Sequence, residues 1–279
     1  MCGVLYIAFG QQYRCEALQS ISSLHKFHPN LPCCLITDAK VNDLPSGVEV
    51  VLRQAETNHP LRAKPRYLRE SPFDRTLFLD TDTTTVRPIL GLFHLLDRFD
   101  IGLHMLPLYT DHPKYRYLNN PSSGVVLFRR CAAVSCTFDR WLELFDKEAS
   151  AADTHDPDSR HRIIDDPLLM RAIYETEVRL VPLPAAMNFH LGLPTVTASP
   201  IHILHGRHPD PVGLARLVDQ GRPAGLPNCD PRVWVPQLLS PLPDGSLRRP
   251  AIWVRAPFYA LHAVISRLWA LALLRLRSR

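Results

Sequence analysis

The segment TLFLDTDTTT, residues 76–85, decides how the rest of this 279-residue chain is interpreted. An apolar run typical of a buried strand ends directly in two aspartates, Asp80 and Asp82. In an open parallel sheet, ligands bind beyond the carboxyl ends of the strands. Two carboxylates delivered to such an end repel each other unless a cation lies between them, and hard divalent ions prefer oxygen ligands. The segment therefore predicts a strand that presents a metal site, with a surface Asx-type turn as the plainer alternative.

Apolar runs and helical stripes alternate on both sides of this segment. Strands are predicted at 4–8, 31–36, 48–52, 101–106, 124–128, 178–181 and 201–204. Apolar residues three and four positions apart predict helices at 13–28, 62–69, 89–96, 132–147 and 167–174. Strands that alternate with helices indicate an α/β fold with a mostly parallel central sheet flanked by helices.

The composition indicates a globular protein, because 46% of the residues are hydrophobic and 21% are charged. The formal net charge is +5, and seven arginines lie in the segment 248–279. The rest of the chain is therefore close to neutral, which argues against a nucleic acid polymer as the partner.

The seven cysteines show no C-x-x-C spacing, so neither a zinc knuckle nor a redox pair is predicted. We expect reduced thiols that act as small hydrophobic side chains. The first residues read GVLYIAFG from position 3, which resembles a strand rather than a signal peptide. A cytoplasmic location follows as an expectation.

The chain divides into three parts: a catalytic domain at 1–208, a proline-rich extension at 209–250 and a basic amphipathic helical tail at 251–279. Residues 257–274 are mostly apolar, but His262 and Arg267 interrupt them. A membrane span needs about 20 apolar residues, so a true span is disfavoured. Two interpretations stay open: a peripheral helix on an anionic membrane surface, or a helix packed on protein.

The aspartate pair also has two other interpretations, a phosphohydrolase active site and an EF-hand calcium loop. FLDTDTTTV is similar to the D-x-D-x-[TV] signature of haloacid dehalogenase-type phosphohydrolases, in which Asp80 is the nucleophile and Asp82 the acid/base. In that superfamily the signature closes the first strand, whereas at least two strand and helix units precede it here. An EF-hand is excluded, because Thr85 and Gly91 stand where its glycine and glutamate are required.

Six segments, in order, resemble the family-8-like glycosyltransferases of the GT-A type. They lie at 3–38, 64–83, 119–130, 163–175, 183–191 and 201–207. The second of them, KPRYLRESPFDRTLFLDTDT, is similar to the stretch around the D-x-D motif of these nucleotide-diphospho-sugar transferases. The resemblance covers roughly residues 3–207 and implies a GT-A fold, which is Rossmann-like.

The resemblance also implies a role for individual residues. It implies metal ligands for Mn²⁺ (or Mg²⁺) at Asp80, Asp82 and His205. It implies catalytic residues at Lys64, Asp165 and Asp166. The implied nucleotide- and sugar-binding residues are Tyr6, Ala8, Gly10, Tyr13, Thr81, Ser123, Gly124, Asn188 and Gly206.

The function implied is metal-dependent transfer of a sugar from a nucleotide-diphosphate donor, such as a UDP-sugar, to an acceptor hydroxyl. The family resemblance favours a retaining, hexosyltransferase-like reaction. The chain departs from the family pattern at Ser122, Ile164 and Asp166, and Arg207 follows the histidine–glycine pair in place of the usual K-P-W. These departures keep open a degenerate protein that binds a nucleotide sugar without turnover.

Overall fold

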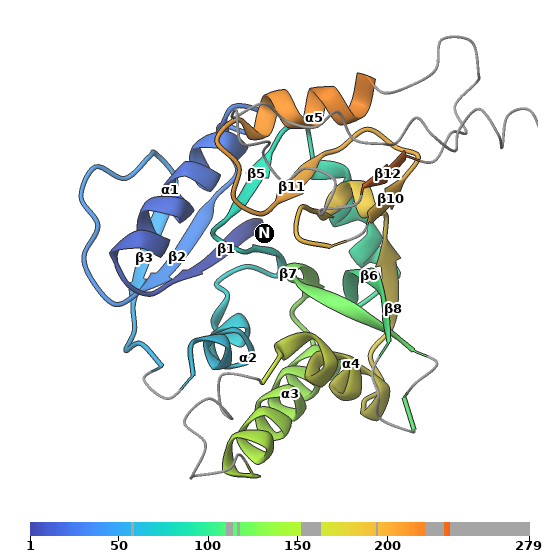
Figure 1. Cartoon of the computed structure of the whole chain (residues 1–279). Coiled ribbons are helices and arrows are strands. Elements are labelled where there is room, and N and C mark those ends of the chain that lie inside the picture. Colours follow the sequence, from blue (N-terminus) through green and yellow to red (C-terminus); the bar gives the residue numbers. More distant parts are fainter. Residues whose placement is uncertain are drawn as a thin grey trace, which may run out of the picture.

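The computed structural model describes residues 1–56, 59–109, 114–115, 118–151, 163–193, 195–220 and 232–234. Its centre is a seven-stranded sheet with the strand order β3-β2-β1-β4-β7-β6-β8 (Figure 1). The strands are β1 (Cys2–Ala8), β2 (Cys33–Thr37), β3 (Val48–Leu52), β4 (Arg75–Leu79), β6 (Ile101–Tyr109), β7 (Asn119–Arg129) and β8 (Leu180–Leu183). Within this sheet β7 alone runs opposite to the other strands. The predicted α/β fold with a mostly parallel sheet is confirmed.

Helices cover both faces of the sheet (Figure 1). The helix α1 (Gln11–His25) and the 3₁₀ helix η3 (Leu90–Asp97) pack on one face, while α2 (Ala63–Tyr67), α3 (Ala132–Ala151) and α4 (Asp165–Glu175) pack on the other. Alternate residues of β1 serve the two layers: Val4 and Tyr6 contact the α1 side and Leu5 the α2 side. A strand buried on both faces reads as a continuous apolar run.

A second, three-stranded sheet lies at the carboxyl end of β4, in the order β5-β11-β9. Its strands are β5 (Thr83–Thr85), β11 (Ile203–His205) and β9 (Phe189–His190). Because β5 follows the aspartate turn directly and pairs antiparallel with β11, His205 lies opposite Thr83. The pairing brings the end of β11 beside the two aspartates.

The remaining elements are η1 (Pro60–Arg62), η2 (Leu68–Glu70), η5 (Ala185–Met187), β10 (Thr195–Thr197), β12 (Arg232–Trp234) and α5 (Pro211–Gln220). The sequence did not predict α5, because prolines are dense there. Proline is nevertheless tolerated in the first helical turn, as at Pro211. Leu214, Ala215 and Val218 pack in one cluster with residues of β9 and β11, so α5 folds with the second sheet. The segment predicted as a helix at 89–96 forms the 3₁₀ helix η3, Leu90–Asp97, and Ile89 lies just before it.

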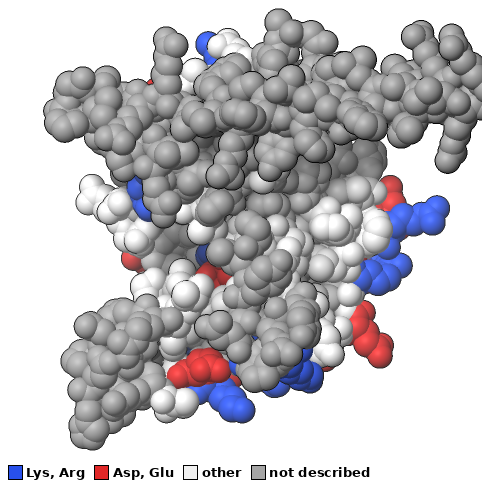
Figure 2. Space-filling model, turned by 45° about the vertical axis from the view of Figure 1, so that its right-hand side comes forward, with Lys and Arg blue, Asp and Glu red and all other residues white. Residues whose placement is uncertain are grey.

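Charged side chains of both signs lie close together on the described surface visible in Figure 2. Among the ion pairs of the described residues, Arg140 contacts both Glu143 and Glu175. Among the helices that the structure describes, none combines the length and hydropathy needed to cross a membrane. The tail at 251–279 and most of the extension at 209–250 lie outside the described residues, and so does the predicted membrane-surface helix.

Candidate metal centre and its surroundings

Three metal-ligating side chains converge at the carboxyl end of β4. Asp80 follows β4, Asp82 lies in the turn to β5, and His205 closes β11. One ligand atom from each lies within 4.8 Å of the others. His205 Nε2 lies 3.6 Å from Asp80 Oδ2 and 3.4 Å from Asp82 Oδ1. We call these three residues the acidic triad.

The acidic triad has the donor set and spacing of a divalent-metal site. The two carboxylates suit a divalent ion such as Mn²⁺ or Mg²⁺, the imidazole adds a nitrogen ligand of the kind that transition metals accept, and neighbouring ligands of an octahedral ion with bonds of about 2.1 Å lie about 3 Å apart. Gly124 gives the ligands room, because a Cβ there would lie 2.1 Å from His205 Cε1 and 2.9 Å from Asp80 Oδ2. The Gly124 carbonyl also accepts the Asp80 amide at 2.8 Å. The residues present therefore fit a metal ion.

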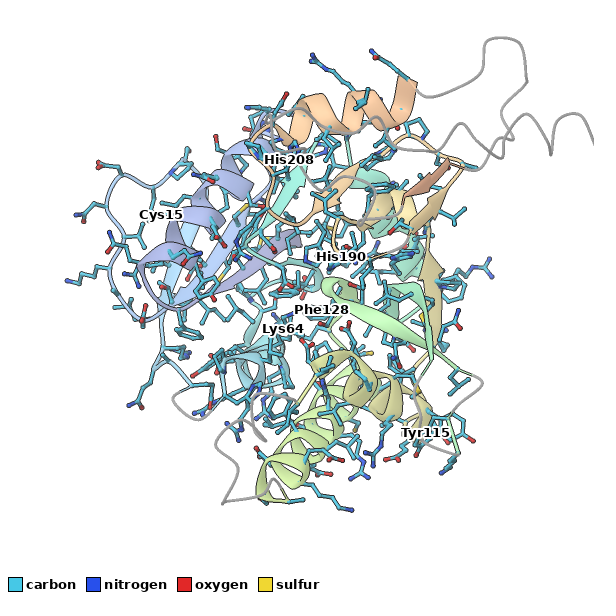
Figure 3. The ribbon with its side chains drawn as sticks, viewed as in Figure 1. Cys15, Lys64, Tyr115, Phe128, His190 and His208 are labelled. Atoms are coloured by element: carbon cyan, nitrogen blue, oxygen red, sulfur yellow. The ribbon has the colours of Figure 1, made fainter. Side chains whose placement is uncertain are left out.

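A second polar group, which we call the lysine cluster, adjoins the triad and consists of Lys64, Ser123, Asp165 and Asp166. Lys64 Nζ donates to Asp80 Oδ2 at 2.9 Å and to Ser123 Oγ at 3.1 Å, and lies 3.1 Å from Asp165 Oδ2. Ser123 Oγ donates to Asp165 Oδ2, and its backbone amide to Asp166 Oδ1, both at 2.8 Å. The cluster thus joins α2, β7 and α4 (Figure 3, which labels Lys64).

Burial and charge shift the pKa values within the lysine cluster in different directions. Burial alone would lower the pKa of Lys64, but the carboxylates of Asp165, Asp80 and Asp166 outweigh it and raise that pKa well above its usual range. Burial opposes ionisation of Asp165 too, yet Lys64 and Ser123 lower its pKa. Burial, reinforced by the charge of Asp165, raises the pKa of Asp166 to about 6. Of the two neighbouring carboxylates of α4, Asp165 is therefore the one that Lys64 keeps ionised.

Glu16 of α1, which was not predicted as a site residue, connects Arg207 and Thr81 beside Asp82. Arg207 donates from Nε and Nη2 to the two Glu16 carboxylate oxygens, at 2.7 and 2.9 Å, and Thr81 Oγ1 donates to Oε2 at 3.1 Å. Arg207 Nη1 also lies 3.7 Å from Asp82 Oδ2. Burial raises the pKa of Asp82, but the His205 ring and the Arg207 guanidinium outweigh it and lower that pKa to about 2. Glu16 lies in the helix that follows β1, and this position was the sequence signal that could have identified it as a site residue.

The residues predicted near β1 lie at different depths. Tyr6 and Ala8 are buried in the core, and the Tyr6 hydroxyl is 3.1 Å from Ser20 Oγ. Gly10 precedes α1 with a φ of +87°, which favours glycine, and Tyr13 is 47% exposed. Gly10 and Tyr13 are therefore the two of these four that a ligand can reach.

The predicted residues on the other side of the triad surround His205. Asn188 is fully buried, with Oδ1 2.9 Å from His205 Nδ1. The His190 ring, which was not predicted, packs edge-on against His205 at a centroid distance of 4.4 Å, near the centre of the molecule in Figure 3. The Gly206 amide donates to the Asp82 carbonyl at 3.0 Å. Pairing of β9 with β11 therefore positions His190 beside His205.

Solved structures of glycosyltransferases share this fold. The galactosyltransferase LgtC, crystallised with donor and acceptor sugar analogues, matches with a TM-score of 0.51 and 13% identity, over 75% of this chain and 88% of LgtC. The glycosyltransferase GlyE of Streptococcus pneumoniae TIGR4 matches with a TM-score of 0.51 and 16% identity, over 75% of this chain and 55% of GlyE. No protein-family model and no curated protein sequence matches the chain. The predicted GT-A fold is confirmed, and the neighbours give no support to the phosphohydrolase alternative.

Proposed function

We propose that this protein is a metal-dependent glycosyltransferase that moves a hexose from a nucleotide-diphosphate donor, a UDP-sugar, to an acceptor hydroxyl. The observation that supports this most is the acidic triad beside the lysine cluster, at the carboxyl end of β4 in a GT-A fold. A cation site next to buried sugar-binding carboxylates is what a nucleotide-diphosphate sugar requires. The catalytic part is proposed to be 1–208, and the site is proposed to work in the cytosol.

The proposed roles follow from the charges. Asp80, Asp82 and His205 would hold a divalent ion, which would supply positive charge to stabilise a departing diphosphate. Arg207 lies at the outer side of Asp82, where its guanidinium can bind phosphate oxygens bidentately. Gly206 lets a phosphate approach the backbone closely.

On the inner side, the lysine cluster binds the transferred sugar. Asp165 and Asp166 accept hydrogen bonds from sugar hydroxyls, and Lys64 holds Asp80 and Asp165 in place. Asp165 is a poor base because Lys64 lowers its pKa. A retaining reaction does not need a base for the acceptor hydroxyl, and we propose that outcome. Gly10, Tyr13 and Thr81 are proposed to contact the nucleoside, and Ser123 and Gly124 the sugar.

Donor hydrolysis tests the proposal. The full-length protein should release UDP from at least one member of a panel of UDP-sugars with Mn²⁺, and EDTA should stop the release. Asp82→Ala should abolish it, whereas the matched control Asp139→Ala, an exposed aspartate of α3, should retain it. Mn²⁺-dependent release by Asp82→Ala would contradict the metal role. Donor binding without release would identify a degenerate binding protein, and magnesium-dependent hydrolysis of a simple phosphomonoester would favour the phosphohydrolase.

A further inference from the structure

Asn188 is buried next to the proposed metal ligand His205, and only one of its two polar side-chain atoms has a hydrogen-bond partner among the described residues. Its side chain has no exposed surface, and Oδ1 lies 2.9 Å from His205 Nδ1. Asn188 Nδ2 is buried without a hydrogen-bond partner among the described residues. An unpaired buried donor costs about 1–3 kcal/mol, so an amide at this position requires an explanation.

The one hydrogen bond that Asn188 makes determines where His205 carries its proton. A carbonyl oxygen only accepts, so His205 Nδ1 must donate to Asn188 Oδ1. Nε2 is then the nitrogen that can give up a proton and bind a cation with its lone pair. Its distances to the aspartate oxygens, 3.4 and 3.6 Å, exceed the usual limit of about 3.2 Å for an N–H···O hydrogen bond. The firm hydrogen bond of the ring is therefore the one to Asn188.

The backbone around Asn188 holds its side chain in register with the ring. The Asn188 amide donates to the Ala185 carbonyl at 3.1 Å, and the next residue, Phe189, pairs with Leu204 of β11. On its other side the His205 ring lies so close to Gly124 that no Cβ fits there. The ring thus has little freedom to turn and exchange its two nitrogens.

We propose that Asn188 is a positioning residue: it keeps a proton on Nδ1 of His205, so that the Nε2 lone pair is directed between Asp80 and Asp82 toward a divalent ion. The inference rests on the metal site of the proposed function. Outer-shell partners of metal-binding histidines fix the ring tautomer in this way, and their loss typically lowers metal affinity 10–100-fold.

Two variants of the full-length protein separate positioning from packing. Asn188→Leu keeps the branched shape and the number of side-chain heavy atoms but cannot accept a hydrogen bond, whereas Asn188→Asp keeps the acceptor. The first measurement is the protonation of the His205 ring nitrogens, by long-range ¹H–¹⁵N NMR without metal and with Mg²⁺, assigned with His205→Gln. The second is Mn²⁺ affinity by electron paramagnetic resonance.

We expect a proton on Nδ1 of His205 in the wild type and in Asn188→Asp, with and without Mg²⁺. Asn188→Leu should lose this preference and bind Mn²⁺ about 10–100-fold more weakly, while Asn188→Asp stays close to the wild type. A proton on Nε2 with a bare Nδ1 in the wild type would overturn the proposal, as would unchanged Mn²⁺ affinity in Asn188→Leu. If Asn188→Leu does not fold, the wild type and Asn188→Asp still decide the position of the proton.

Neither measurement uses turnover, so the outcomes separate this inference from the proposed function. A chain that shows the Nδ1 proton and binds Mn²⁺ but acts on no sugar donor would contradict the function and support the inference. A chain that transfers sugar but has no proton on Nδ1 of His205 would support the function and contradict the inference.

Discussion

The acidic triad and the lysine cluster meet at Asp80 but balance their charges differently. The lysine cluster contains its own cation, since Lys64 Nζ lies within 3.1 Å of Asp80 and Asp165 oxygens. In the acidic triad, two carboxylates face an imidazole nitrogen at 3.4 and 3.6 Å, and the exposed Arg207 lies 3.7 Å from Asp82. One group is satisfied by folding, whereas the other has room for a cation from solution. The site thus combines one group of charges that is balanced within the protein, the lysine cluster, with a second group, the acidic triad, whose charge a bound cation would balance.

Removal of the internal cation should erase this difference and have the largest effect. Lys64→Met leaves Asp165 and Asp166 buried without a counter-charge, and breaking a buried pair typically costs about 3–5 kcal/mol. We expect a decrease of that size in the free energy of unfolding, measured by urea denaturation without metal. The matched control is Lys26→Met, at an exposed position. If both variants unfold at the same urea concentration, Lys64 does not stabilise the fold.

Replacing Asp166 with a neutral side chain should raise the free energy of unfolding at neutral pH, measured by urea denaturation. Its pKa is raised from 3.8 to about 6, so the protonated group stabilises the folded state fully below pH 3.8, and this contribution is lost as pH rises through 6. Because each pKa unit corresponds to about 1.4 kcal/mol, Asp166→Asn should gain roughly 2–3 kcal/mol over the wild type at pH 7.5 and little at pH 3.5.

Replacing the neighbouring carboxylate, Asp165, should have the opposite effect on the free energy of unfolding, again measured by urea denaturation. The pKa of Asp165 is lowered, so its charge stabilises the fold above its ordinary pKa, and Asp165→Asn should destabilise the protein at pH 7.5. Equal effects of the two variants would contradict the assignment of Asp165 as the partner of Lys64.

The smallest of these effects should come from filling the space between the two groups. Gly124→Ala places a Cβ against His205 and Asp80, and overpacking of this kind costs about 1–3 kcal/mol. A thermal melt without metal would measure the loss, with Gly91→Ala as the control, since no atom lies within 4 Å of a Cβ there. A neutral Gly124→Ala would show that the ligands shift freely.

The central sheet could be predicted from the sequence because its strands lie between two layers. β1, β2 and β4 are buried on both faces along most of their length, so each contains a run of consecutive apolar residues. β9 and β10 have two and three residues, too few to show any periodicity, and they were not predicted. The polar start of β7, NNPSS, lay outside the strand predicted at 124–128, yet it belongs to the strand in the structure and is buried from Asn120 on.

The candidate site divides in the same way. Asp80 and Asp82 follow a predictable strand, and the resemblance added His205. The contacts of Lys64 with Asp165 and of Glu16 with Arg207 join residues 101 and 191 positions apart, respectively, and no local pattern encodes them. Their roles in binding stay predictions, whereas their positions follow from the pairing of elements distant in the sequence.

The pairing of β5 with β11 also determines when, during synthesis on the ribosome, the three side chains of the acidic triad can come together. Residues 83–85 leave the ribosome with both aspartates, but their partner strand lies roughly 120 residues later. At synthesis rates of about 5–20 residues per second, this corresponds to roughly 6–24 s during which the aspartates have no third ligand. A metal ion bound as proposed would therefore gain its third protein ligand only after β11 has been synthesised.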